Sequence, residues 1–392
     1  MYAQLNAALS PNLHQAAPPR FDYLDLKAQY ATIREEVTEA IARVMETQHF
    51  ILGAEVEKFE QEIAAHIGAR HAVSCASGSD ALVLALLAAG VVPGDEIITT
   101  PFTFIATGGS IARTGATPVF VDVEPETFNI SPAAIEAAIT PRTRGIMPVH
   151  LFGLAAEMDS IVSLAKQYSL FVVEDAAQAI GARYRGENAG VMGTFGCFSF
   201  FPSKNLGGAG DGGLLTTEDA ALAEKLRMLR VHGSKKKYHH EILGTNSRLD
   251  ALQAAILRVK LRHLDRWTQQ RQIRADHYRS LFEAMDLSHS VRVPAAAGSD
   301  LVHVYNQFTI RCTERDALRE HLRSLGIPTE IYYPLPLHLQ PAFSYLGYRA
   351  GQLPAAEAAS EEVLSLPVYP ELSDSQQERV VQGIASFYKQ RG

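Results

Sequence analysis

The chain of 392 residues has little cysteine and no long apolar run. Its three cysteines, Cys75, Cys197 and Cys312, lie far apart and form no CxxC pair, which excludes a zinc cluster of that spacing and a disulfide framework and indicates a cytoplasmic location. No stretch reaches the roughly 18 apolar residues of a membrane span, so we expect no membrane partner. Residues 1–20 lack the charged start and apolar core of a secretion signal, and we expect them to form a disordered extension.

An excess of basic residues is also missing. The formal net charge is -7, and the basic residues are spread along the chain, which argues against a nucleic-acid partner. The one basic run, GSKKKYHH at 233–240, is interpreted as a solvated loop, with steering of a nucleotide diphosphate as the alternative. The adjacent pair His239 and His240 is not spaced like ligands on one helix face, so no metal site is expected.

Periodic patterns predict an α/β fold in two lobes. Strand and helix signals alternate from about 71 to 220, which is typical of a mostly parallel sheet sandwiched by helices. A helical stretch from about 248 to 284 leads to a second lobe with a strand at 303–312 and a helix at 315–327. We therefore expect a large domain over residues 21–260 and a smaller α+β domain over residues 261–392.

Lys204 is the most informative residue. It lies in SFFPSKNLGGAGDGG (199–213), between a serine-bearing apolar strand and a glycine-rich turn, a setting that suits a Schiff base with pyridoxal phosphate. Asp175 follows the apolar run LFVV, at the strand edge where ligands of such sheets bind, and would keep the pyridine nitrogen of that cofactor protonated. Gln178 would reach the phenolic oxygen of the cofactor if the chain turns helically there.

The segment 71–91 supplies a site for the cofactor phosphate. A short strand breaks at 77–79, and a helical apolar pattern begins at Ala81, so the free amides of the helix start and the hydroxyl of Ser79 form an anion site. Ser199 adds a second hydroxyl. Phe104, in TTPFTF, is expected to stack on the cofactor ring.

These residues have plainer interpretations as well. Asp175 could cap an ordinary βα turn, Phe104 could belong to the core, and a lysine after a strand is usually a surface residue. The glycines at 208–213 also satisfy the dinucleotide fingerprint G-x-G-x-x-G, but they run into the strand-like GLLTT instead of opening a helix. We interpret them as giving the backbone room near the lysine.

Several ordered strings resemble the DegT family of aminotransferases that act on nucleotide-linked keto sugars. They include SGSDALVLAL, GDEIITTPFTFIAT, VEDAAQAIGA, SFFPSKNLGGAGDGG and GTNSRLDALQAAILRVKL, and the resemblance covers roughly residues 21–392. It implies a fold type I pyridoxal-phosphate enzyme. It also implies the Schiff base on Lys204, the pyridinium contact on Asp175, the phenolic-oxygen contact on Gln178, ring stacking on Phe104, and phosphate contacts on Gly78, Ser79 and Ser199.

The resemblance implies a homodimer, in which Asn246 reaches across to the phosphate of the neighbouring site. It implies substrate contacts at Arg248, Tyr332, Tyr333 and His338. Many relatives read His-Tyr-Pro where this chain reads Tyr-Tyr-Pro at 332–334, so the chain departs from the family pattern at the substrate contacts of 332–338.

The implied function is transfer of an amino group from an amino acid, L-glutamate in the first place, to a keto group of a nucleotide-diphosphate-linked sugar. The basic loop followed by GTNSRLDALQAAILRVKL resembles the members that aminate C-3 more than those that act at C-4. Some relatives are sugar dehydratases, but those have histidine in place of the lysine at position 204. The alternative that is not an enzyme is a regulatory protein that binds pyridoxal phosphate without turnover.

Overall fold

The computed structural model describes residues 21–296 and 298–391, so the extension expected over residues 1–20 lies outside the described residues. Among the described residues, seven strands form the main sheet in the order β1-β9-β8-β5-β4-β2-β3. Strand β9 runs antiparallel to β1 and β8, and the other neighbouring pairs are parallel. The strands are β1 (His71–Cys75), β2 (Glu96–Thr99), β3 (Thr117–Phe120), β4 (Thr143–Met147), β5 (Phe171–Asp175), β8 (Phe195–Ser199) and β9 (Gly213–Thr217).

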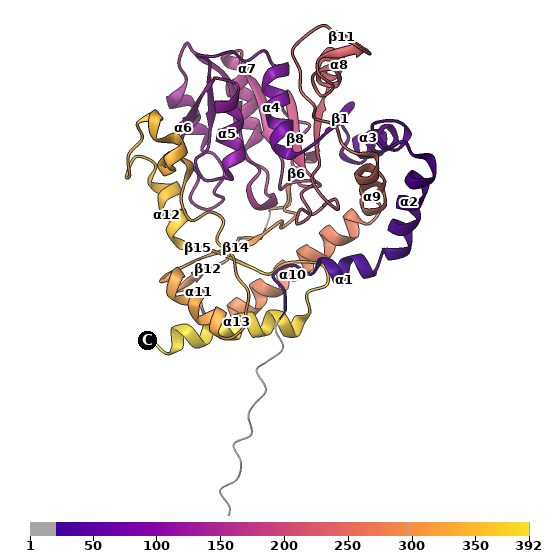
Figure 1. The fold of residues 1–392 in the computed structure, drawn as a ribbon. Helices are drawn as coiled ribbons and strands as arrows, with labels where there is room; N and C mark the ends of the chain where they lie inside the picture. The colour runs from indigo at the N-terminus through magenta and orange to yellow at the C-terminus, as the bar shows by residue number, and fades with distance from the viewer. Residues whose placement is uncertain (1–20, 297, 392) are drawn as a thin grey trace, which may run out of the picture.

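Helices cover both faces of this sheet, as the sequence pattern predicts (Figure 1). Successive residues of one strand point to opposite faces: Ile97 and Val173 pack with helices α4, α5 and α8, whereas Ile98 and Val172 pack with α6 and α7. Helices α2, α3 and α9 cover the β1 end of the sheet. The helices are α2 (Arg34–Thr47), α3 (Ala54–Ile67), α4 (Gly78–Ala88), α5 (Ile105–Arg113), α6 (Pro132–Ala138), α7 (Met158–Gln167), α8 (Ala220–Leu229) and α9 (Ala251–Leu261).

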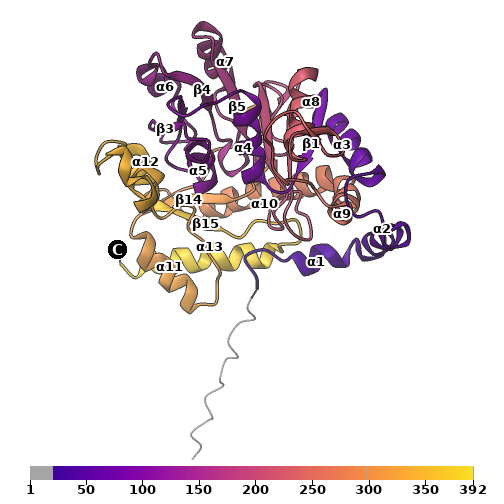
Figure 2. The same ribbon diagram turned by 45° about the horizontal axis from the view of Figure 1, so that its top comes forward.

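A second lobe is built on a small antiparallel sheet, β12-β14-β15, which packs with α10, α11 and α13 around its own core. Figures 1 and 2 show these helices gathered below the main sheet, next to the short helix α1. The rings of Tyr278 and Phe308 stack in this core with centroids 4.9 Å apart. The elements are α1 (Leu26–Ala31), α10 (Leu264–Ala284), β12 (Val291–Arg292), β14 (Phe308–Cys312), α11 (Arg315–Ser324), β15 (Val363–Leu366) and α13 (Asp374–Lys389).

The remaining elements connect the lobes or extend from them. Helix α12 (Pro354–Glu362) packs beside the end of β3, in a cluster with Phe102 and Phe120. Strand β6 (Arg183–Tyr184) pairs with both β7 (Glu187–Asn188) and β13 (Leu301–Val302), and β10 (Ser234–Lys236) pairs with β11 (His239–His240). Short 3-10 turns occupy Leu151–Gly153, Leu337–Leu339 and Pro341–Leu346.

Backbone hydrogen bonds join the two lobes beside the first of these turns. The amide of Val304 donates to the carbonyl of Gly153 at 3.0 Å, and that of Asn306 donates to the carbonyl of Phe152 at 2.9 Å. A side-chain atom on Gly153 would lie 2.7 Å from Val304 Cγ2, so this contact requires glycine. The expected domain boundary between residues 260 and 261 stays a prediction; it falls at the end of α9, and Phe21 packs on the second core.

Two predicted elements are shorter than expected. The helical stretch expected over 248–284 is two helices, because α9 ends at Leu261 and α10 begins at Leu264. The strand expected at 303–312 begins only at Phe308, because Tyr305 takes a left-handed φ of 44° that an extended strand cannot contain. None of the helices in the described part of the chain combines the length and apolar composition that crossing a bilayer needs.

Candidate active site

A cleft of about 610 Å³ opens where β5 and β8 end. It brings together predicted residues that lie up to 255 positions apart, from Gly78 to Tyr333. The predicted residues that line it are Gly78, Ser79, Phe104, Asp175, Gln178, Ser199, Lys204, Tyr332 and Tyr333. The cleft lies within the size range of sites that hold small molecules and cofactors.

Lys204 reaches the cleft from the turn that follows β8. Its amide donates to the carbonyl of Phe201 at 2.9 Å, and the amide of Gly208 donates to the carbonyl of Phe200 at 2.8 Å, so the turn is closed by its own backbone. Burial lowers the pKa of Lys204 to about 8, while the negative charge of Asp175 acts in the opposite direction. The lowered pKa makes the neutral amine, the form that a nucleophile or base requires, far more abundant near neutral pH than in an ordinary lysine.

Asp175 ends β5 and is fixed by hydrogen bonds to both carboxylate oxygens. Thr107 Oγ1 donates to Oδ2 at 2.8 Å, and the amide of Ala177 donates to Oδ1 at 3.2 Å. Because Thr107 has one hydroxyl proton, Thr103 must supply the hydrogen of the 3.0 Å contact between the two threonines. Burial raises the pKa of Asp175 above its ordinary value, and the Thr107 hydrogen bond opposes this rise. The carboxylate has one fixed orientation toward the cleft.

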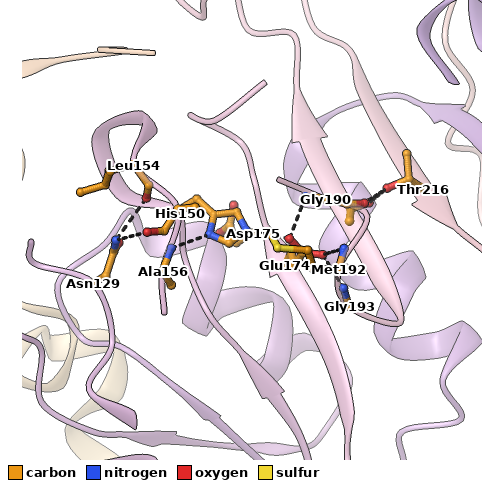
Figure 3. Close-up of polar contacts among 12 residues, drawn as sticks. Asn129, His150, Leu154, Ala156, Glu174, Asp175, Gly190, Met192, Gly193 and Thr216 are labelled. Carbon is orange, nitrogen blue, oxygen red and sulfur yellow. Dashed lines mark hydrogen bonds and ion pairs between the residues drawn. The ribbon is translucent and has the colours of Figure 1, made fainter. Parts of the chain in front are cut away.

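Behind Asp175, the buried carboxylate of Glu174 accepts four hydrogen bonds (Figure 3). Its donors are His150 Nε2 at 2.8 Å and the amides of Gly190, Met192 and Gly193 at 2.7, 2.8 and 2.5 Å. The amide of Ala156 donates to His150 Nδ1 at 3.1 Å, which leaves the ring proton on Nε2. This network fixes the end of β5, because any rotation of the buried Glu174 carboxylate would break hydrogen bonds that water cannot replace.

The N-terminus of α4 lines the cleft at the place where the sequence predicts an anion site, and the helix begins at Gly78, three residues before the apolar pattern that starts at Ala81. Ser77 caps the helix by accepting from the amide of Asp80 at 3.1 Å, which leaves the amides of Gly78 and Ser79 available. A Cβ atom on Gly78 would lie 2.7 Å from Ser199 Cβ. The glycine therefore allows the helix start and the Ser199 hydroxyl to meet at the same part of the cleft.

Gln178 lies in a turn and not in the helix that the sequence suggested; the turn is closed by the amide of Ala179 donating to the carbonyl of Ala176 at 2.9 Å. The Gln178 side chain still reaches the cleft. The Phe104 ring is 55% exposed and lines the same cleft, so it is free to stack on a bound ring and is not a core residue.

Three predicted site residues are not brought into this cleft. The side chain of His338 is fully buried and faces the Glu357 carboxylate on α12 at 3.1 Å, so it has no surface with which to contact a substrate. Asn246 is exposed and pairs with Val231, outside the cleft. Arg248 is half-buried and makes no hydrogen bond or ion pair with any residue that the structure describes.

Several residues that line the cleft were not predicted from the sequence. Gln307 of the second lobe and Thr103, Phe201, Ser203 and Asp211 of the large lobe line the cleft. Thr103 carries a weak signal, since it lies four residues before Thr107 in the segment that follows β2. Nothing local to the sequence marks Gln307, because its position depends on how the two lobes meet.

The rejection of the dinucleotide fingerprint at 208–213 is confirmed, since these glycines lead into β9 (Gly213–Thr217) and open no helix. A Cβ atom on Gly213 would lie 2.3 Å from the carbonyl oxygen of Ser77, and one on Gly207 would lie 2.3 Å from that of Pro202. The glycines therefore allow close backbone packing around the lysine turn and the helix start.

Solved structures share this architecture. The crystal structure of Streptomyces venezuelae DesV in complex with a ketimine intermediate is similar with a TM-score of 0.91 and 47% sequence identity, covering 94% of this chain and 98% of that chain. The fold is thus the fold type I transferase fold that the resemblance implied, with a lysine, a carboxylate and a helix N-terminus around one cleft. The chain belongs to the DegT/DnrJ/EryC1/StrS aminotransferase family, whose sequence profile matches residues 31–385.

Relatives with curated names span nearly the full chain. A "pleiotropic regulatory protein" of Geobacillus stearothermophilus is 54% identical over 93% of this chain and 98% of its own length. The dTDP-3-amino-3,4,6-trideoxy-alpha-D-glucose transaminase of Streptomyces venezuelae is 47% identical over 95% of this chain and 97% of its own. A UDP-N-acetyl-3-dehydro-alpha-D-glucosamine 3-aminotransferase of Acidithiobacillus ferrooxidans is 48% identical over 91% of this chain and 95% of its own.

Proposed function

We propose that this protein is a pyridoxal-phosphate-dependent aminotransferase that moves an amino group from L-glutamate to the C-3 keto group of a nucleotide-diphosphate-linked sugar, in the biosynthesis of deoxyamino sugars. The observation that carries the proposal is the placement of Lys204 and Asp175 in one cleft with the N-terminus of α4. Two relatives named as transaminases of 3-amino or 3-keto sugars support the position of amination, one on a dTDP sugar and one on a UDP sugar.

The residues of the cleft fit the cofactor. Lys204 offers an amine whose pKa is lowered to about 8, and a buried carboxylate at Asp175 matches a protonated ring nitrogen. The amides of α4 and two hydroxyls match a phosphate group. Lys204 would hold the aldehyde, Asp175 the ring nitrogen, Gln178 the phenolic oxygen, Phe104 one face of the ring, and Gly78, Ser79 and Ser199 the phosphate.

When bound, pyridoxal phosphate supplies an aldehyde that condenses with amines and a ring that accepts electrons from the neighbouring carbon. Lys204 would hold the aldehyde and, once the donor amine takes its place, its Nζ would be the base that moves a proton between the donor α-carbon and the C4′ carbon. With a keto sugar as acceptor, the same amine would move the proton in the opposite direction. Asp175 would hold its negative charge against the ring nitrogen, since Thr107 and the amide of Ala177 fix its carboxylate.

Tyr332 and Tyr333 of the second lobe line the cleft, and we propose that they contact the sugar. We propose that the protein acts as a homodimer in which Asn246 reaches the phosphate of the second copy's site, and the substrate contact predicted for Arg248 stays a prediction. The position of Asn246 outside its own cleft supports this arrangement, whereas the burial of His338 against Glu357 leaves it no surface for substrate binding. A cytoplasmic location stays a prediction; the three cysteines on which it rests are free and buried.

Two measurements test the function. Reduction with borohydride followed by peptide mass spectrometry is expected to find a pyridoxyl group on Lys204, and its absence would contradict the proposal. A panel of 3-keto and 4-keto sugars linked to dTDP or UDP, offered with L-glutamate, is expected to give a 3-amino product. Lys204→Ala and Lys204→Arg are expected to abolish this turnover while the fold, measured by circular dichroism, stays intact.

A regulatory protein without turnover is the second candidate, favoured by the name of the Geobacillus stearothermophilus relative. The two candidates differ in how the bound cofactor responds to amino donors. A visible absorption band that shifts when L-glutamate is added favours the transaminase, and a band that ignores every amino donor favours the regulatory protein.

A further inference from the structure

The carbonyl oxygen of the Gln178 side chain is anchored by the backbone of the 3-10 turn Leu151–Gly153. The amide of Phe152 donates to Gln178 Oε1 at 2.7 Å. A backbone N–H accepts nothing, so the oxygen of the Gln178 amide must face Phe152 and the NH2 group must point away from it. This contact decides which end of the amide faces the turn, but by itself it leaves the direction of Nε2 free to turn about the anchored oxygen.

Tyr333 occupies the other side of the same amide. Gln178 Nε2 donates to the hydroxyl oxygen of Tyr333 at 3.0 Å, and both side chains line the cleft. One of the two Nε2 hydrogens is thus committed to Tyr333, and the second is left to the cleft. The Tyr333 O–H proton has no acceptor among the residues that the structure describes, so it too is available there.

The ring of Tyr333 is placed by packing and not by its hydroxyl. Its centroid lies 6.3 Å from that of Phe102, edge to face, and 6.3 Å from that of Phe104. Burial raises the pKa of Tyr333 above its ordinary value, with the charge of Asp175 acting in the same direction, so the hydroxyl keeps its proton. Removal of the hydroxyl alone would leave the ring in place and free the Gln178 amide to rotate its donors.

We propose that Tyr333 is a positioning residue for the cofactor: by accepting one hydrogen of the Gln178 amide, it aims the other at the phenolic oxygen of pyridoxal phosphate. This inference rests on the proposed function. It gives a residue of the second lobe a task at the cofactor, beside the substrate contact expected for it. It also predicts that the effect of Tyr333 depends on the phenolic group and passes through Gln178.

The test compares pyridoxal phosphate with 3-deoxypyridoxal phosphate, which lacks the phenolic group, by measuring the dissociation constants of both for full-length protein freed of cofactor. Tyr333→Phe is expected to raise the dissociation constant of pyridoxal phosphate by about 3- to 10-fold, the range of one ordinary hydrogen bond. It is expected to leave the dissociation constant of the analogue unchanged. In a Gln178→Leu background, the same substitution is expected to have no further effect on either compound.

Tyr332→Phe is the matched control, because the Tyr332 side chain lines the same cleft but its hydroxyl is hydrogen-bonded to Tyr23. It is expected to keep the wild-type ratio of the two dissociation constants. Equal weakening of both compounds by Tyr333→Phe, or full additivity with Gln178→Leu, would overturn the inference and leave Tyr333 a packing residue. Wild-type protein that binds neither compound would instead refute the proposed function.

Discussion

The ionisation of Lys204 gives the sharpest prediction. Its pKa of about 8 replaces the ordinary value of 10.5, because burial penalises the charged ammonium. Below the pKa the amine is protonated and unreactive, and above it the amine is neutral and reactive. At pH 7 the neutral fraction is therefore about one in ten, against about one in 3,000 for an ordinary lysine, which is a gain of roughly 300-fold. We expect the reaction of Lys204 with an amine reagent to show a midpoint near pH 8.

The assay uses protein freed of cofactor, trinitrobenzenesulfonate over a range of pH, and mass spectrometry of the 199–213 peptide. The same peptide in isolation is the control, since its lysine is fully solvated and should keep the ordinary midpoint. Asp175→Asn removes the negative charge that raises the pKa of Lys204, so it is expected to move the midpoint below that of the wild type. A midpoint near 10 in the folded protein, or an upward shift in Asp175→Asn, would refute the reasoning.

Three further changes probe the parts around this lysine. A glutamine at position 174 cannot accept all four hydrogen bonds, so Glu174→Gln is expected to lower the free energy of unfolding, measured by urea titration, by about 2–4 kcal/mol. An unchanged urea midpoint would contradict a stabilising role for this network. Thr107→Val removes a donor that opposes the raised pKa of Asp175, so the acidic limb of kcat/KM should move to higher pH, not lower. Gly78→Ala brings a methyl group against Ser199, and weaker pyridoxal phosphate binding with an intact fold is the expected result of equilibrium dialysis.

The sequence predicted the parts of the site that local chemistry determines. Apolar runs ending in an acid, a serine-glycine break before a helix and a lysine before a glycine-rich turn each place a side chain at the carboxyl edge of a parallel sheet, which is where Asp175, Ser79 and Lys204 lie. The fold class followed from alternating strand and helix patterns for the same reason: each pattern is set by which face a segment buries.

The errors arose where distant segments meet. His338 looked available in the sequence, but helix α12 places the Glu357 carboxylate against it. The break between α9 and α10 contains no proline or glycine that could mark it in the sequence. Its two residues, Arg262 and His263, also remain near helical dihedral angles. The contact between Gln178 and Tyr333 joins residues 155 positions apart, and no local pattern encodes such a pair.

The direct backbone contact between the lobes bears on how a substrate enters. Many enzymes close two rigid halves around their ligand by rotation at a few loop residues. Here such a rotation would have to break the hydrogen bonds from Val304 to Gly153 and from Asn306 to Phe152, right beside the Gln178 amide. We therefore expect the two lobes to keep this arrangement when a ligand binds, so that the side chains lining the cleft are the direct targets for changing which ligands it accepts.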